Sequence, residues 1–295
     1  MSDRFLFWVP TLIWATTWHA ILYQLGDVSV LQSVAMRFGL ASAVLFAIAH
    51  WRGERLVPPV GRYGWLFVTG SLQYGLNYLG TYQAEKHLAS GLLAVLFSLM
   101  IFTNAIGGAI FFGQRITARF VLSALVGVAG VALIFWSDIA ATRADPAVLG
   151  ALALGLMAVS MASAGNMLTL RLTRSGMPLI PLLAWSMGFG AMFLLLIALA
   201  TGVQFQLDSR PSYWISLAYL SVFGSVASFL LYFKLVQRQG PGRAALVGMV
   251  IPVIALAMSA AFEGWLPSWV AGAGMALCLG ALWAATRTTA VVTPA

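Results

Sequence analysis

Hydrophobic residues along the chain gather into ten long runs, separated by short segments that hold most of the charged residues. Each run has about the 20 mostly apolar residues that a helix needs to cross a membrane. The alternation of apolar and polar residues that marks a membrane barrel strand does not recur. The pattern therefore predicts an all-α membrane protein with ten transmembrane helices at residues 5–24, 30–50, 63–83, 89–112, 118–137, 147–170, 179–201, 213–233, 242–262 and 268–286.

Composition excludes the other broad classes. Hydrophobic residues make up 61% of the 295 residues and charged residues only 8%, whereas about 25% of a soluble domain is charged. So few polar groups could not cover the surface of a soluble globule, and disorder requires low hydrophobicity. The first run lacks a basic leader and a small-residue cleavage site, so we expect it to remain as the first helix.

The basic residues lie mostly on one side of the predicted membrane. Of the 16 Lys and Arg residues, 12 fall in the N-terminal tail, in or next to the loops that follow the second, fourth, sixth and eighth predicted helices, and at the C-terminus. The positive-inside rule then places both termini in the cytoplasm of a bacterial cell, with the chain in the inner membrane. No basic face is large enough to follow a nucleic-acid backbone. The single cysteine, Cys278, excludes a disulfide within the chain or a CxxC metal site, and we expect no metal and no cofactor.

A shift of 151 residues superimposes the second part of the sequence on the first. The shift aligns Gly91 with Gly242, Gly113 with Gly264, and Tyr78 with Phe229. Small and apolar residues match often by chance, but here the order of helices and loops matches as well. We therefore expect two repeats, residues 1–143 and 144–295, with five helices each. Five is an odd number, so the repeats enter the membrane in opposite directions, which is typical of carriers that work by alternating access.

Several short segments carry a family resemblance, and they occur in a defined order along nearly the whole chain: Trp14-Ala15-Thr16, Arg37-Phe38, the stretch from Ala89 to Ala94, Phe112-Gly113-Gln114-Arg115, Gly242-Arg243-Ala244-Ala245, Pro252 and Phe262-Glu263-Gly264. In this order they resemble the EamA-type drug/metabolite transporters, and most closely the YddG-type bacterial amino acid exporters. The resemblance implies a ten-helix exporter. Gln114 stands where the family often has glutamate, so the resemblance assigns Glu263 no transport role.

Polar and aromatic residues recur on single faces of several predicted helices. Asn77 with Tyr74, Tyr78 and Tyr82 marks one such face, and Ser225, Ser228 and Tyr232 mark its counterpart 151 residues later. Such groups prefer protein or water to lipid. They could instead form an interfacial aromatic belt or bond neighbouring helices. The predicted substrate cavity comprises Trp14, Trp18, Asn77, Tyr78, Tyr82, Ser98, Ser163, Asn166, Ser225, Ser228 and Tyr232.

Arg37 and two prolines stand out within the runs. Arg37 could hold a substrate carboxylate, although its place in the outer half of its helix favours a structural role. Pro10 and Pro252 mark a hinge or gate, or else a fixed kink. The small residues in 118–137 and 268–286 predict helices that serve as packing scaffolds.

The predicted function is export of amino acids, aromatic or otherwise neutral, or of similar small metabolites, by a monomer in the lipid bilayer. The alternative within transport is a metabolite, drug or nucleotide-sugar carrier of the same superfamily. A nucleotide-sugar carrier would need several cavity cations, and only Arg37 is available. A membrane enzyme or assembly factor is the alternative of another class, but no catalytic motif is found. All eight acids lie at helix ends or in loops, which argues against proton coupling through a carboxylate and favours a uniporter or exchanger.

Overall fold

The computed structural model describes residues 1–113, 116–141, 145–244, 247–264 and 268–288, and its regular elements are helical. The expected repeat boundary at residues 143 and 144 lies outside these ranges, as do Gln114, Arg115 and Ala245. The predicted all-α fold with ten transmembrane helices is confirmed, although three of the ten helices are interrupted.

Seven membrane helices are continuous α-helices: α1 (Asp3–Leu22), α2 (Val30–Trp51), α7 (Ala118–Ala141), α8 (Pro146–Arg174), α9 (Leu179–Ala200), α12 (Val247–Phe262) and α13 (Trp269–Thr288). The other three change geometry within the membrane. The third consists of α3 (Tyr63–Gly70), the π-helical segment η1 (Ser71–Leu76) and α4 (Asn77–Ala84). The fourth is divided at Leu99 into α5 (Ser90–Ser98) and α6 (Met100–Phe112). The eighth consists of α10 (Pro211–Tyr219), the π-helical segment η2 (Leu220–Ala227) and α11 (Ser228–Ala244).

Length and composition suit these helices to a bilayer. Among the described residues, six helical stretches are long and apolar enough to cross a membrane: Asp3–Leu22, Val30–Trp51, Ser90–Phe112, Pro146–Arg174, Leu179–Ala200 and Pro211–Gln239. Three further apolar helices are shorter. The α3–η1–α4 helix carries Gln73, Asn77 and Thr81, which reduce its hydropathy. Their polarity indicates that this helix faces protein instead of lipid.

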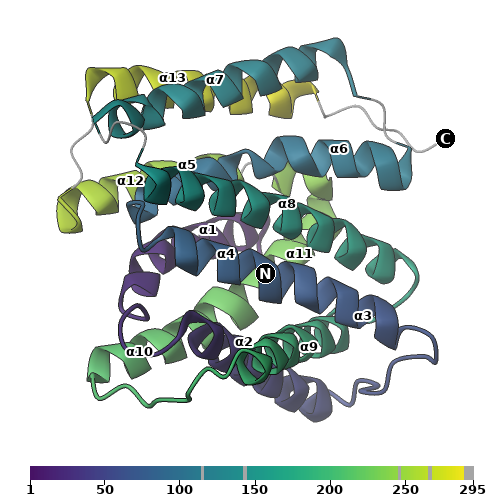
Figure 1. Ribbon diagram of the computed structural model, residues 1–295. Helices are drawn as coiled ribbons and strands as arrows, with labels where there is room; N and C mark the ends of the chain where they lie inside the picture. The colour runs from purple at the N-terminus through teal and green to yellow at the C-terminus, as the bar shows by residue number, and fades with distance from the viewer. Residues whose placement is uncertain (114–115, 142–144, 245–246, 265–267, 289–295) are drawn as a thin grey trace.

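Equivalent helices of the two repeats pack against each other at both edges of the molecule. Helices α7 and α13 form one edge and α2 and α9 form the other, with most of the other helices between them (Figure 1). Small residues permit the close approach of α7 and α13, since a Cβ on Gly130 would lie 2.7 Å from the carbonyl oxygen of Gly274. The two edges leave the centre of the molecule to the helices that carry most of the polar side chains.

Contacts between helix ends define two sides of the molecule. On the side that we call the N-terminal side, Arg238 donates to the carbonyl of Met1, and the Arg174 guanidinium lies 4.5 Å from the Phe112 ring centre. On the opposite side, the Gln32 side chain bonds the backbone of Gln206, and Arg210 donates to the carbonyl of Leu25.

Candidate substrate cavity

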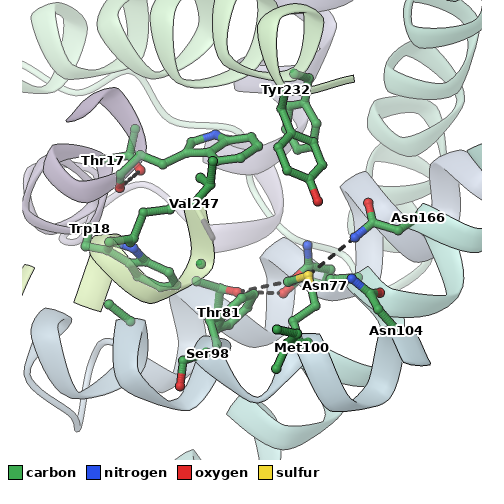
Figure 2. A pocket seen from close by; sticks show the side chains of 18 of the residues that line it. Thr17, Trp18, Asn77, Thr81, Ser98, Met100, Asn104, Asn166, Tyr232 and Val247 are labelled. Carbon is green, nitrogen blue, oxygen red and sulfur yellow. Dashed lines mark hydrogen bonds between the residues drawn. The ribbon is translucent and has the colours of Figure 1, made fainter. Parts of the chain in front are cut away.

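A cavity of about 150 Å³ lies in the centre of the molecule, between helices of both repeats (Figure 2). Its walls come from α1, η1, α4, α5, α6, α8, α11 and α12, with one residue from α13. An engineered protein cavity of about 150 Å³ is known to hold benzene, so a small ring fits here. The lining reaches Ala244 and Val247, where α11 ends and α12 begins on the N-terminal side.

Aromatic rings form one wall of the cavity. Trp14 lies 5.2 Å, centre to centre, from both Phe229 and Tyr232, and Trp18 lies 5.0 Å from Phe97. The indole Nε1 of Trp14 donates to the carbonyl of Gly224 at 3.0 Å. This carbonyl lies within η2, and the bond orients the Trp14 ring. Such a wall suits an apolar or aromatic group of a substrate.

Four amide side chains form the polar wall: Gln73, Asn77, Asn104 and Asn166. Gln73 Nε2 donates to Asn166 Oδ1 at 3.4 Å, and Asn166 Nδ2 donates to the sulfur of Met100 at 3.3 Å. Both contacts are weak, because one is long and the other has a poor acceptor. Gln73 Oε1 and Asn104 Oδ1 are buried acceptors without a hydrogen-bond partner among the described residues. A bound polar group would satisfy these atoms.

Formal charge is missing from the described lining, which contains no Asp, Glu, His, Lys or Arg. Within the described part of the chain, no three His, Cys, Asp or Glu side chains come together as metal ligands either. The cavity therefore acts on a ligand through neutral dipoles, rings and shape.

The structure brings seven of the predicted cavity residues together: Trp14, Trp18, Asn77, Tyr78, Ser98, Asn166 and Tyr232. Their role in substrate binding stays a prediction. The predicted set lacks lining residues such as Gln73 and Asn104. The step of four from Gln73 to Asn77 and Thr81 was a signal that could have identified Gln73.

Four predicted cavity residues lie outside the lining: Tyr82, Ser163, Ser225 and Ser228. The hydroxyls of Ser225 and Ser228 donate to backbone carbonyls five residues earlier, within the widened turns of η2, which removes them from the cavity. The Tyr82 hydroxyl accepts from Arg37. Ser163 is buried on α8, and its Oγ would lie 3.9 Å from a Cβ on Gly107, so it faces α6.

Arg37 lies behind the cavity wall and is only 1% exposed. Its Nε donates to Ser225 Oγ at 3.1 Å, and its Nη1 donates to the Tyr82 hydroxyl at 3.2 Å. Its guanidinium carbon lies 4.6 Å from the ring centre of Tyr78, a lining residue. These contacts favour the structural role over the carboxylate-binding role, because the side chain is occupied by protein groups.

Both prolines occur inside helices, as expected. Pro10 is buried in α1, one turn before Trp14. Pro252 lies in α12 and lines a separate apolar cleft of about 370 Å³ toward α13. Their role as hinges stays a prediction.

A polar network joins three helix ends on the opposite side of the molecule. Glu263 follows the last residue of α12, and its Oε2 accepts from the backbone N–H of Ser90 and from Ser259 Oγ, both at 3.0 Å. Its Oε1 accepts from Ser90 Oγ and lies 3.2 Å from Nδ1 of His19, near the end of α1. Ser259 Oγ accepts from the N–H of Gly91 at 2.8 Å. We call Glu263, Ser90, Ser259 and His19 the closing network, since they hold α1, α5 and α12 together beyond the cavity.

Two of the acids at helix ends, Glu263 and Glu85, are shielded from solvent. Burial alone would raise the pKa of Glu263, but the hydrogen bonds from Ser90, His19 and Ser259 outweigh it and hold the pKa below its usual value. Glu85 follows α4 directly and is only 4% exposed. Both acids lie at helix ends, as expected, and the packing of these ends on the opposite side shields them from solvent.

Comparisons with known proteins agree with this architecture. Two segments of the chain, residues 4–136 and 149–287, each match the EamA-like transporter family. The chain is similar to Protein PecM of Dickeya dadantii (strain 3937), with 26% identity over 88% of this chain and 83% of that protein. It is similar to Protein PagO of Salmonella typhimurium (strain LT2), with 22% identity over 90% of this chain and 86% of that protein.

A solved crystal structure shares the fold, with a TM-score of 0.71 and 19% identity over 99% of both chains. At this identity the likeness concerns the fold alone. The two family matches divide the chain into two repeats and cover most of its length. The chain belongs to the EamA-like transporter family.

Proposed function

We propose that this transporter exports neutral amino acids, with aromatic or other apolar side chains, from the bacterial cytoplasm by alternating access. The observation that carries the proposal is the cavity between the two repeats, whose described lining combines rings and amides without formal charge. Carriers with inverted repeats hold their substrate at such a place, near the middle of the membrane.

The two sides of the molecule support uptake of substrate from the cytoplasm. The excess of Lys and Arg on the N-terminal side supports a cytoplasmic location for that side. The cavity extends toward that side, and the closing network holds α1, α5 and α12 together on the other. This arrangement corresponds to the state that takes up substrate from the cytoplasm.

The lining can satisfy both charges of an amino acid. The amide N–H groups of Asn77 and Asn166 offer donors to a carboxylate, and the unpartnered oxygens of Gln73 and Asn104 offer acceptors to an ammonium group. The rings of Trp14 and Trp18 would contact the side chain. A further charge would find no counter-charge in the described lining, so acidic and basic amino acids are excluded by the cost of burying an unpaired charge.

A neutral heterocyclic metabolite is the second candidate. The same amides and rings could bind a flat uncharged ring through its donors and acceptors, with no ionic partner at all. A nucleotide sugar is disfavoured, because the described lining offers its phosphates no Lys or Arg.

Efflux from proteoliposomes loaded with single radiolabelled compounds tests the proposal. Neutral amino acids with apolar or aromatic side chains should leave faster than from protein-free vesicles, while lysine and glutamate should not. Trp18→Ala should reduce this efflux about tenfold or more, since a buried aromatic contact contributes over 1 kcal/mol. Trp136→Ala is the matched control, because Trp136 on α7 is 62% exposed and is not part of the lining. Efflux of purine-like heterocycles alone would favour the second candidate, and equal efflux of lysine would contradict both.

A further inference from the structure

Glu85 is a buried carboxyl group without any visible partner. Both of its carboxyl oxygens are inaccessible, and neither has a hydrogen bond within the described residues. Burial raises its pKa well above the usual value, and the negative charge of nearby Glu263 adds to this rise. An ionised carboxylate in such surroundings would be costly, so the neutral acid is the stable form.

The charged and titratable groups around Glu85 come from several helices. The positive charge of Arg37 on α2 lowers the pKa of Glu85. The Arg37 guanidinium, however, bonds Tyr82 and Ser225. Among the described residues it forms no ion pair with Glu85 within 4 Å. Glu263, beyond α12, carries its own bonded partners and connects to His19 on α1. Lys86 and His87, the next residues, are exposed on the opposite side. The residue that follows Glu85 in the sequence is therefore exposed to water, and Ser90 of the closing network follows Glu85 by five residues.

Two neighbouring carboxyls are thus held in opposite protonation states. Glu263 is bonded by Ser90, Ser259 and His19 and stays ionised, while Glu85 has no donor and stays protonated. Pairs of acids whose surroundings separate their pKa values in this way are typical of sites that move protons. Glu85 precedes by five residues Ser90, whose backbone N–H and hydroxyl bond Glu263 in the closing network.

We infer that Glu85 is a proton-binding site that takes up a proton when the closing network forms and releases it to water when α5 and α12 separate. This inference rests on the proposed alternating-access function. Separation of Ser90 from Ser259 and Glu263 would move the segment that follows Glu85 and admit water to its carboxyl. The acid would then lose its proton to that water, leaving a hydrated carboxylate.

The sign of the pH dependence follows from linkage. The closed state has the higher pKa at Glu85, so it binds the proton more tightly and is favoured at low pH. A rise in the external pH shifts the protein toward the state that is open on the opposite side, by at most about tenfold per pH unit for one proton. This effect concerns the empty carrier and needs no knowledge of the substrate.

Thiol labelling from outside the cell measures the opening. Thr17→Cys places a thiol reporter on α1 in the cavity wall. The unsubstituted chain, whose single cysteine Cys278 is buried, measures the background labelling. A membrane-impermeant maleimide is added to cells between about pH 5 and pH 8. At each pH, the labelling rate of Thr17→Cys is divided by the rate of the double variant Thr17→Cys, Glu85→Gln. This ratio cancels the effect of pH on the ionisation of the reporter thiol. The ratio should rise with pH, up to about tenfold per unit.

Controls make each outcome decisive. Glu54→Gln, on the N-terminal side where Glu54 pairs with Arg52, should leave the rise unchanged. A flat ratio would overturn the inference, even if amino acid efflux is normal.

Should Glu85→Gln fail to fold, infrared spectra of the unsubstituted protein decide. A carboxylic acid band that disappears as the pH rises supports the inference, and its absence at all pH values overturns it. If the labelling ratio rises with pH as expected but the unsubstituted protein exports no neutral amino acid, the proposed function would be contradicted and the inference about Glu85 would stand.

Discussion

The two π-helical segments have the same place in their repeats but different chemistry. Helix resumes at Asn77 after η1 and at Ser228 after η2, and these residues are 151 positions apart. A π-helical turn is rare and concentrates at functional sites. Its occurrence at equivalent positions shows that the backbone deformation belongs to the repeat, whatever side chains it carries.

In the first repeat, η1 turns polar side chains toward the cavity. Gln73 lies within it and Asn77 directly follows it, and both line the cavity. Glycines on the neighbouring helices allow this segment to pack closely. A Cβ on Gly165 of α8 would collide with the Gln73 side chain, and Gly70 lies against Ser186 and Gly190 of α9.

In the second repeat, η2 uses its polar groups to hold other parts of the protein. The carbonyl of Gly224 accepts from Trp14, and Ser225 accepts from Arg37. The repeats therefore share this backbone deformation and use it differently. The segment η1 and the residue after it supply two of the four cavity amides, whereas η2 anchors the cavity walls.

The largest effect is expected where η1 begins. Gly70→Leu should abolish or strongly reduce the yield of folded protein, because a Cβ there would lie 2.9 Å from the backbone nitrogen of Gly190 and overlap the carbonyl of Ser186. Backbone atoms of a packed helix cannot move aside cheaply, and we expect a cost above about 3 kcal/mol. Gel filtration and thermal unfolding in detergent measure it.

Gly64→Leu is the matched control, since nothing lies within 4 Å of a Cβ on Gly64 in the same helix. In the second repeat, Ser221 occupies the position equivalent to Gly70 and already carries a side chain. Equal yields of Gly70→Leu and Gly64→Leu would show that the close approach to α9 is not required.

The next effect concerns the anchoring role of η2. Arg37→Met should lower the free energy of unfolding by about 1–3 kcal/mol, because the Tyr82 hydroxyl loses its donor in a buried place. Thermal unfolding of the purified protein measures the change, and Arg62→Met, in the loop before α3, serves as control. A loss of efflux at unchanged stability would instead assign Arg37 to the substrate.

Asn77 and Ser228 test the comparison directly, since they are equivalent positions with different neighbours. Asn77→Ala removes a cavity amide and should raise the KM for efflux about tenfold, the equivalent of about 1.4 kcal/mol. Ser228→Ala removes a hydroxyl that bonds only the carbonyl of Phe223 among the described residues, so it should change the KM less than about twofold. Similar effects of the two substitutions would show that both repeats line the substrate path equally.

The fold was predictable from the sequence because its signals are local. Ten apolar runs, the bias of the basic residues and the shift of 151 residues depend on composition and order alone. The breaks in three helices were not predicted. A π-helical turn in η1 or η2 depends on how the helix packs against α9 or α2, and the sequence of the helix itself does not reveal it.

The cavity was only partly predictable, for a geometric reason. A helical face found by counting steps of three or four assumes ideal α-helix, and η2 has wider turns. Ser225 and Ser228 therefore lie outside the lining, whereas the predicted residues Trp14, Trp18 and Asn77 lie in it. Burial of Glu85 depends on contacts between the ends of different helices, which the sequence of a single helix does not reveal.

The smallest effect concerns the loops that lead into the two helices with π-helical segments, α3–η1–α4 and α10–η2–α11. Before α10, Asp208 accepts from Arg210 at 2.6 Å and is almost fully buried, whereas before α3 the pair of Arg52 and Glu54 is more exposed. Hydrogen bonds from Arg210 lower the pKa of Asp208 despite the opposing effect of its burial. A lowered pKa contributes stability above the unfolded value of about 3.9 and loses it as the pH falls.

Asp208→Asn should therefore lower the melting temperature slightly at neutral pH, and the difference from the unsubstituted protein should shrink toward zero below about pH 4. Glu54→Gln should change the melting temperature less at every pH, since exposed ion pairs contribute little. Thermal unfolding across this pH range measures both. If the two substitutions had equal effects, the entry into η2 would be no more firmly held than the entry into η1, and the anchoring role of the second repeat would be limited to the contacts of Gly224 and Ser225.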